Sequence, residues 1–112
     1  MSEVVESDWE VICGSSDILP FVGVRALLGE EQVAVFRVRE KLFAISAIDP
    51  FTKTAVLARG IVGDLQNQTV VASPLYKQHF NLETGVCLED NSIKVKTFRV
   101  REQAGKIELA AR

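Results

Sequence analysis

The sequence predicts an all-β fold, and three observations support this prediction. About eight or nine short segments are rich in apolar and β-branched residues, which favour strands. Turn signals separate these segments at close intervals. No segment carries a sustained 3.6-residue period, so long helices are not expected. The chain has 112 residues, and we therefore expect residues 1–112 to form a single domain, either a β sandwich or a barrel.

The first half of the chain contains the clearest strand patterns. A first strand is expected at residues 9–13, and it ends at the polar turn 14–17. A second strand is expected at 24–28, before a glycine and two glutamates. Residues 32–39 are rich in β-branched side chains, and residues 42–48 return after a short reversal. These last two segments are therefore predicted to form a hairpin.

The alternation of apolar and polar residues that is typical of strands is lost at Asp49 and returns about twenty residues later. From Asp49 to Asp64 there is little alternation, and residues 56–58 predict only a single helical turn. Pro74 ends the next strand because proline has no N–H to give to a ladder. The remaining strands are expected at 69–73, 79–82, 94–100 and 106–109.

Composition and charge exclude several classes of partner. The net charge is −2 and no basic run exists, so nucleic-acid binding is not predicted. No apolar stretch approaches the ~20 residues that span a bilayer. Residues 1–6 are acidic and lack the apolar region of a signal peptide. Cys13 and Cys87 form no CxxC pair and are expected to be free thiols packed as small apolar residues. A cytoplasmic location is therefore expected, with no membrane partner.

No common catalytic constellation is present in the sequence. The chain has one histidine, His79, so a site built on a histidine pair is impossible. There is no nucleophile elbow, and the seven glycines are scattered at turns and do not form a phosphate loop. We predict no catalytic residue and interpret His79 as a surface or half-buried side chain beside a strand. A contact between His79 and a partner protein stays open.

One segment is informative about function. Residues 73–85 resemble the second half of a Rieske iron–sulfur motif, which reads Cys-Pro-x-His-Gly-x-x-Phe-Asp-Leu-x-Thr-Gly. The first half of that motif, Cys-x-His after a strand, is matched in position by residues 49–51. Asn81 replaces the usual aspartate. The residues that stand where the pattern requires them are Pro74, Phe80, Leu82, Thr84 and Gly85.

All four ligand positions of this motif are altered. Asp49 and Ser73 occupy the two cysteine positions, and Phe51 and Tyr76 occupy the two histidine positions. A phenyl ring donates nothing to a metal, and oxygen donors match the soft cluster poorly. We therefore expect no metal site at these positions. Phe51, Leu75 and Tyr76 are expected to fill the gap with apolar contacts, and Asp49 and Ser73 to accept hydrogen bonds from backbone N–H groups.

The pattern of lost ligands resembles a known family. Residues 49–51, 56–64 and 73–78, together with Trp9 and Cys13, are similar to the small subunit of NAD(P)H-dependent nitrite reductase. The resemblance covers nearly the whole chain, and its specific part runs from residue 49 to residue 87. It implies a Rieske-like fold of packed antiparallel sheets, whose cluster-binding loops hold no cluster.

The resemblance also implies a role and a partner. The family partners a large subunit that carries FAD, a [4Fe–4S] cluster and sirohaem, where NADH or NADPH reduces nitrite to ammonium. This chain has no motif for those cofactors, so it is expected to assist assembly, stability or tuning of the large subunit without carrying catalytic residues.

In a Rieske domain the two loops form an exposed tip where partners dock. Candidate docking residues are therefore Arg59, Lys77, Gln78 and His79, although Arg59 and Lys77 are also readily interpreted as ordinary solvated charges. Three other readings stay open. One is a Rieske-type ferredoxin, which the missing ligands argue against. The others are a small free-standing enzyme and a β-domain interaction module of unrelated pathway.

Overall fold

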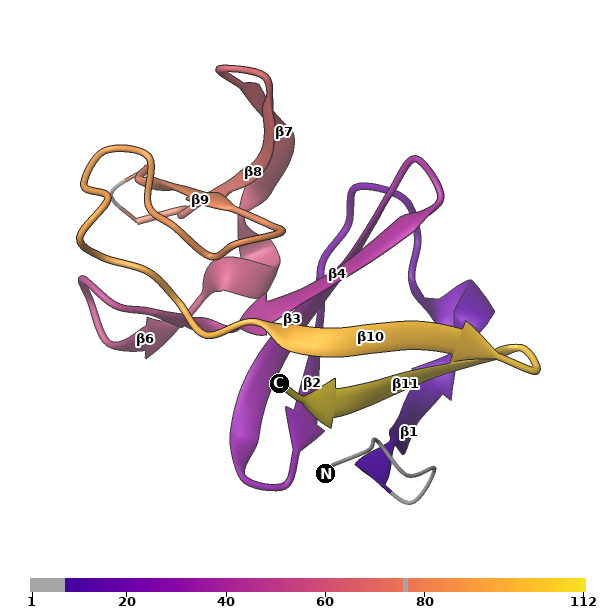
Figure 1. The fold of residues 1–112 in the computed structure, drawn as a ribbon. Helices are drawn as coiled ribbons and strands as arrows, with labels where there is room; N and C mark the ends of the chain where they lie inside the picture. Colours follow the sequence, from indigo (N-terminus) through magenta and orange to yellow (C-terminus); the bar gives the residue numbers. More distant parts are fainter. Residues whose placement is uncertain (1–7, 76) are drawn as a thin grey trace, which may run out of the picture.

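A computed structural model describes residues 8–75 and 77–112, and Figure 1 shows its arrangement. The described residues form four antiparallel sheets, ordered β1-β11-β10, β2-β3-β4, β5-β6 and β7-β8-β9. The all-β prediction is confirmed. The strands are β1 (Glu10–Gly14), β2 (Val24–Leu28), β3 (Glu31–Val38), β4 (Lys41–Ser46), β5 (Ile48–Asp49), β6 (Thr54–Ala55), β7 (Ile61–Leu65), β8 (Gln68–Ala72), β9 (His79–Asn81), β10 (Phe98–Gln103) and β11 (Lys106–Ala111). The described residues also include the short 3₁₀ turns η2 (Ser15–Asp17) and η3 (Leu57–Arg59).

Strand β3 lies at the centre of the molecule and is buried on both faces. Ala34, Phe36 and Val38 belong to a first core that also contains Phe80. Val33 and Val35 of the same strand belong to a second core that contains Phe98. This double burial explains why residues 33–36 are a continuous apolar run, because a strand covered on both faces needs no polar side.

The two cores lie against different sheets. In the second core, β2-β3-β4 packs against the β1-β11-β10 sheet through Ile107 and Leu109. In the first core, the same central strands meet Val71 of β8 and Phe80 of β9. Figure 1 shows β10 and β11 passing across β3 and β4, with β7, β8 and β9 grouped at the opposite end. The second half of the Rieske-like motif, residues 73–85, follows β8 and includes β9, whereas the first half, residues 49–51, begins in β5.

Strand β7 was not predicted from the sequence. Residues 61–65 were expected to lack strand structure, but they pair with β8 in full register from Ile61↔Ala72 to Leu65↔Gln68. Gly63 and Asp64 hide the alternation, and both are residues that strands usually avoid. The two strands are joined by Gln66 and Asn67, which both adopt positive φ angles of 55° and 63°. Such a two-residue turn matches the twist of a hairpin.

The other expected elements are found close to their predicted places. The single helical turn is η3, shifted by one residue from the predicted 56–58. The last hairpin begins at Phe98, later than the expected residue 94, because Val86↔Lys94 and Ile45↔Thr97 are isolated bridges outside the strands. Within the described ranges, no helix is long and apolar enough to cross a membrane.

Candidate functional site

The two positions that would hold cysteine ligands in a Rieske motif are joined by a direct hydrogen bond. Asp49 ends β5, Ser73 follows β8, and both side chains are fully buried. The Ser73 hydroxyl donates to Asp49 Oδ2 at 2.5 Å. The bond gives two buried polar side chains a partner away from water. The two loops of the motif are therefore connected by the residues that replace the ligands.

The same two side chains also fix the backbone of their own loops. The N–H of Phe51 donates to Asp49 Oδ1 at 2.8 Å, and the N–H of Leu75 donates to Ser73 Oγ at 3.4 Å. This confirms that Asp49 and Ser73 accept backbone hydrogen bonds, as expected. The bond between the two side chains was not anticipated. It was hidden because the residues lie 24 positions apart in sequence.

The expectation that three apolar side chains fill the gap is wrong for the two that the structure describes. Phe51 is 40% exposed and Leu75 is 48% exposed. The third, Tyr76, lies outside the described residues. The bond between Asp49 and Ser73 connects the two loops directly. Phe51 instead lies over the edge of the first core, with its ring centroid 6.3 Å from that of Phe80.

His79 is held by an acidic side chain that sequence inspection did not single out. Glu89 Oε1 accepts the backbone N–H of His79 at 2.8 Å, and Glu89 Oε2 lies 2.6 Å from His79 Nδ1. Partial burial acts to raise the pKa of Glu89, but the hydrogen bonds from His79 outweigh it and lower that pKa below its ordinary value. The nearby Cys87 thiol has a raised pKa, chiefly because it is buried. The two contacts of Glu89 with His79 therefore hold the first residue of β9 in place.

Substituting Glu89 with glutamine should remove a stabilising contribution that is larger near pH 7 than near pH 3. Because the folded pKa of Glu89 is lowered, its contribution is complete above the unfolded value of about 4.3 and disappears as the pH falls through the folded value. The pair is partly exposed, so the difference should stay below about 1 kcal/mol. Urea unfolding at both pH values measures it, with Glu30→Gln as the charge-matched control. An equal effect at both pH values would contradict this assignment.

Two of the four predicted docking residues, Arg59 and His79, line two different hollows of the surface. Arg59 lines a hollow of about 240 Å³ together with Arg25. His79 lines another, of about 150 Å³, on the β7-β8-β9 sheet. Lys77 adopts a left-handed backbone with φ 66° and donates its N–H to the Ser73 carbonyl at 3.0 Å. The side-chain oxygen of Gln78 is buried, and within residues 8–75 and 77–112 it has no hydrogen-bond donor.

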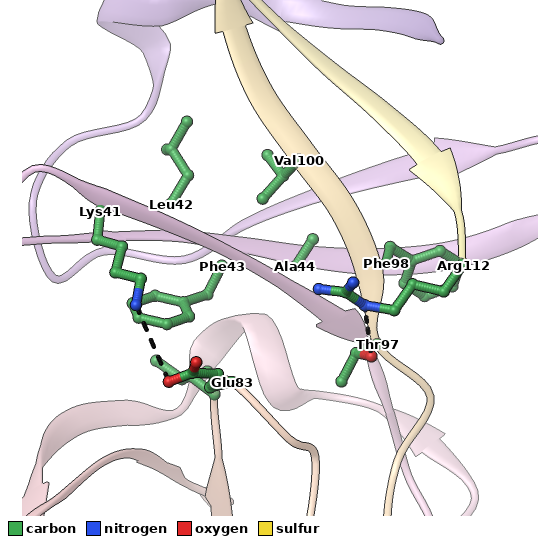
Figure 2. Close-up of a pocket in the computed structure, with 10 residues that line it drawn as sticks. Lys41, Leu42, Phe43, Ala44, Glu83, Thr97, Phe98, Val100 and Arg112 are labelled. Carbon is green, nitrogen blue, oxygen red and sulfur yellow. Dashed lines mark hydrogen bonds and ion pairs between the residues drawn. The ribbon is translucent and has the colours of Figure 1, made fainter. Parts of the chain in front are cut away.

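A third hollow lies between β4 and β10 and is shown in Figure 2. Its floor is apolar and includes Phe43, and its rim carries Lys41, which lies 3.9 Å from Glu83. Arg112 donates to Thr97 Oγ1 at 3.0 Å on the other side. The volume of about 130 Å³ is well below the roughly 300 Å³ at which ligand pockets begin. This hollow is therefore too small for a nucleotide or flavin.

Comparison with known proteins identifies the class and then the family. The profile of the Rieske-like [2Fe-2S] domain matches residues 8–110, which places the chain in that class of β domain. The nitrite reductase (NADH) small subunit of Escherichia coli K12 is 49% identical over 105 residues, which cover 92% of this chain and 97% of that protein. The chain belongs to the family of nitrite reductase small subunits.

Two further comparisons agree with this assignment. The crystal structure of a protein described as a putative NADH-dependent nitrite reductase small subunit from Mycobacterium tuberculosis has a TM-score of 0.88 and 37% identity, covering 93% of this chain and 95% of that one. A region of the nitrite reductase [NAD(P)H] large subunit of Klebsiella oxytoca is 34% identical over 99 residues. These cover 88% of this chain but only 10% of that protein.

The [2Fe–2S] cluster after which the Rieske-like domain class is named does not fit the residues of this chain. A Rieske [2Fe–2S] centre needs two thiolates and two imidazoles, but Asp49 and Ser73 offer oxygens that are bonded to each other, and Phe51 offers no donor. Cys13 packs against the second core, whereas Cys87 belongs to the first. Among the described residues, no group of three or more His, Cys, Asp or Glu side chains is placed to hold a metal.

Proposed function

We propose that this chain is the accessory small subunit of an NAD(P)H-dependent nitrite reductase and that it supports a large subunit that carries out the redox chemistry. The observation that carries this proposal is the bond between Asp49 and Ser73, which closes the motif without metal ligands. The relatives support it, because the E. coli small subunit matches over almost its whole length. The Rieske-like domain is kept, while the residues at its ligand positions are replaced.

The partner in this proposal is the large subunit of the same enzyme. In the Klebsiella protein a region similar to this chain is part of the large subunit itself, which supports a lasting contact between the two. FAD, sirohaem and the [4Fe–4S] cluster are proposed to reside in the large subunit and not in this chain. We further propose that residues 1–112 act as one domain. A cytoplasmic location is supported by two free cysteines that lie in different cores.

Reconstitution of the two subunits tests this function. The chain is purified anaerobically, its iron content and visible spectrum are recorded, and nitrite-dependent NADH and NADPH oxidation is measured with the large subunit alone and with both. We expect no iron and no turnover for the chain alone, co-elution with the large subunit, and higher or longer-lasting activity of the pair. Stoichiometric iron with a Rieske spectrum would instead favour a ferredoxin-type electron carrier.

Charge reversal at Arg59 tests the proposed docking tip, which comprises Arg59, Lys77, Gln78 and His79. Arg59 is exposed beside Arg25, so an acidic group of the partner is expected to lie against this pair. Arg59→Glu should weaken binding of the large subunit by roughly tenfold, or about 1.4 kcal/mol. Lys106→Glu makes a comparable change on β11, which belongs to a different sheet, and serves as the control. Equal affinity of the two variants in a biosensor assay would remove Arg59 from the interface.

A further inference from the structure

The β7-β8-β9 sheet has an outer face whose residues belong to neither of the two cores. In the strand register Ile61 lies opposite Ala72, and Gly63 lies opposite Val70. Ala72 is in turn opposite His79 on β9. Residues opposite one another share a face, and their neighbours Val62 and Val71 point into the first core. The outer face is therefore built from the alternate residues of all three strands.

This outer face is hollowed at its middle. The hollow has a volume of about 150 Å³ and is lined by Ile61, Gly63, Val70, Ala72 and His79, among others. Val70 is buried, whereas Ile61 is 74% exposed, which is the highest value among the large apolar side chains that the structure describes. An apolar residue left this open on an ordered strand is a candidate contact for another protein.

Gly63 has no role inside the chain that requires a glycine. Its φ is not positive, and a Cβ built on it would meet nothing within 4 Å. Gly60 differs, because its Cβ would lie 2.4 Å from the carbonyl of Ala72, and Gly85 would place one 2.2 Å from the carbonyl of Val95. A glycine inside a strand weakens it and often marks close approach of a ligand or another backbone. The open space above Gly63 is therefore the feature that needs an explanation.

The charges around the hollow are already paired within the chain. Asp64 lies 2.6 Å from Arg39, and His79 lies 2.6 Å from Glu89. An ion would find no unpaired opposite charge in the lining. A space of about 150 Å³ is enough for a group of benzene size but not for a drug-sized molecule. The hollow therefore suits one uncharged side chain of a protein, either aromatic or branched aliphatic.

We propose that this hollow receives one apolar side chain of the nitrite reductase large subunit. The inference rests on the proposed function, since it takes the large subunit as the partner. His79 lines the hollow and is also a residue of the proposed docking tip, so the hollow adjoins the tip at His79. Burial of an anchor side chain in such a pocket is the usual form of a binding hot spot. Ile61 stands at its edge, and Gly63 keeps it open.

Gly63→Val gives a direct test with full-length chain and purified large subunit. Because the added side chain meets nothing in the fold, the variant should keep or raise the thermal midpoint of the free chain, as valine favours strands. It should also weaken binding of the large subunit at least about tenfold. A substitution that stabilises the free protein and weakens the complex is not explained by misfolding.

Ile61→Ser provides a second variant with a matched control. It should weaken the complex by a similar factor, whereas Leu27→Ser, at a residue 59% exposed on β2, should change the affinity less than about twofold. If the wild-type chain binds the large subunit but Gly63→Val and Ile61→Ser bind equally well, the hollow is not the docking site and the proposed function stands. If the wild-type chain does not bind at all, both proposals fail.

Sedimentation of the free chain tests a third outcome, in which a second copy of this chain occupies the hollow. If the wild-type chain self-associates and Gly63→Val does so less, with affinity for the large subunit unchanged, a second copy of this chain occupies the hollow. That result would overturn the proposal for the large subunit. A monomeric wild-type chain whose complex is weakened by both variants would support it.

Discussion

Replacing Phe80 with alanine should lower the free energy of unfolding by about 3–5 kcal/mol. Phe80 lies on β9 with its side chain fully buried in the first core, where it meets the central β3-β4 strands. Its backbone bridges to Cys87, and its ring supports Phe51 of the other loop. Truncation would leave a cavity where the β7-β8-β9 sheet joins the rest of the molecule. Urea unfolding followed by far-ultraviolet circular dichroism measures the loss.

The control for this substitution is Phe21→Ala. Phe21 is a half-exposed phenylalanine in the loop before β2, so its truncation should change stability by no more than about 0.5 kcal/mol. The Phe80 variant is also expected to affect binding of the large subunit. Since His79 is the residue before Phe80, the Phe80 variant should also weaken the complex with the large subunit. A loss of less than about 1 kcal/mol would show that the sheet is held mainly by other contacts.

Substituting Asp49 with alanine should be the second most damaging change, with a loss of about 2–4 kcal/mol. The carboxylate accepts the Ser73 hydroxyl and the N–H of Phe51, and both donors would be left without this partner next to the core. A buried donor deprived of its acceptor costs about 1–3 kcal/mol. The Asp49→Ala chain should therefore unfold at clearly lower urea concentration than the wild type.

A double-mutant cycle isolates the bond between the two loops. Ser73→Ala alone should also destabilise, because it leaves one oxygen of a buried carboxylate unpaired. The combined Asp49→Ala and Ser73→Ala chain should lose less than the sum of the two single losses, with a coupling of roughly 0.5–3 kcal/mol. Additive losses would mean that the bond contributes nothing of its own. Asp49→Asn, which keeps the shape of the side chain, should be milder than Asp49→Ala.

Local patterns were sufficient to predict most strands, because alternation and turn residues act over a few positions. They failed at β7, where Gly63 and Asp64 break the alternation although pairing with β8 still forms a strand. They also did not anticipate that Phe51 and Leu75 are exposed. Exposure of a side chain in a loop depends on what the opposite loop brings against it, and that depends on contacts between distant residues.

Residue identities at fixed spacing were enough to predict the fold class, the loss of every Rieske ligand and the family. The bond between Asp49 and Ser73 and the contact of Glu89 with His79 became evident only in the folded molecule. The same is true of the open hollow beside Gly63. A hydrogen bond or a hollow needs side chains from distant parts of the chain to lie next to one another. In this fold, the packing of both cores around β3 brings those parts together.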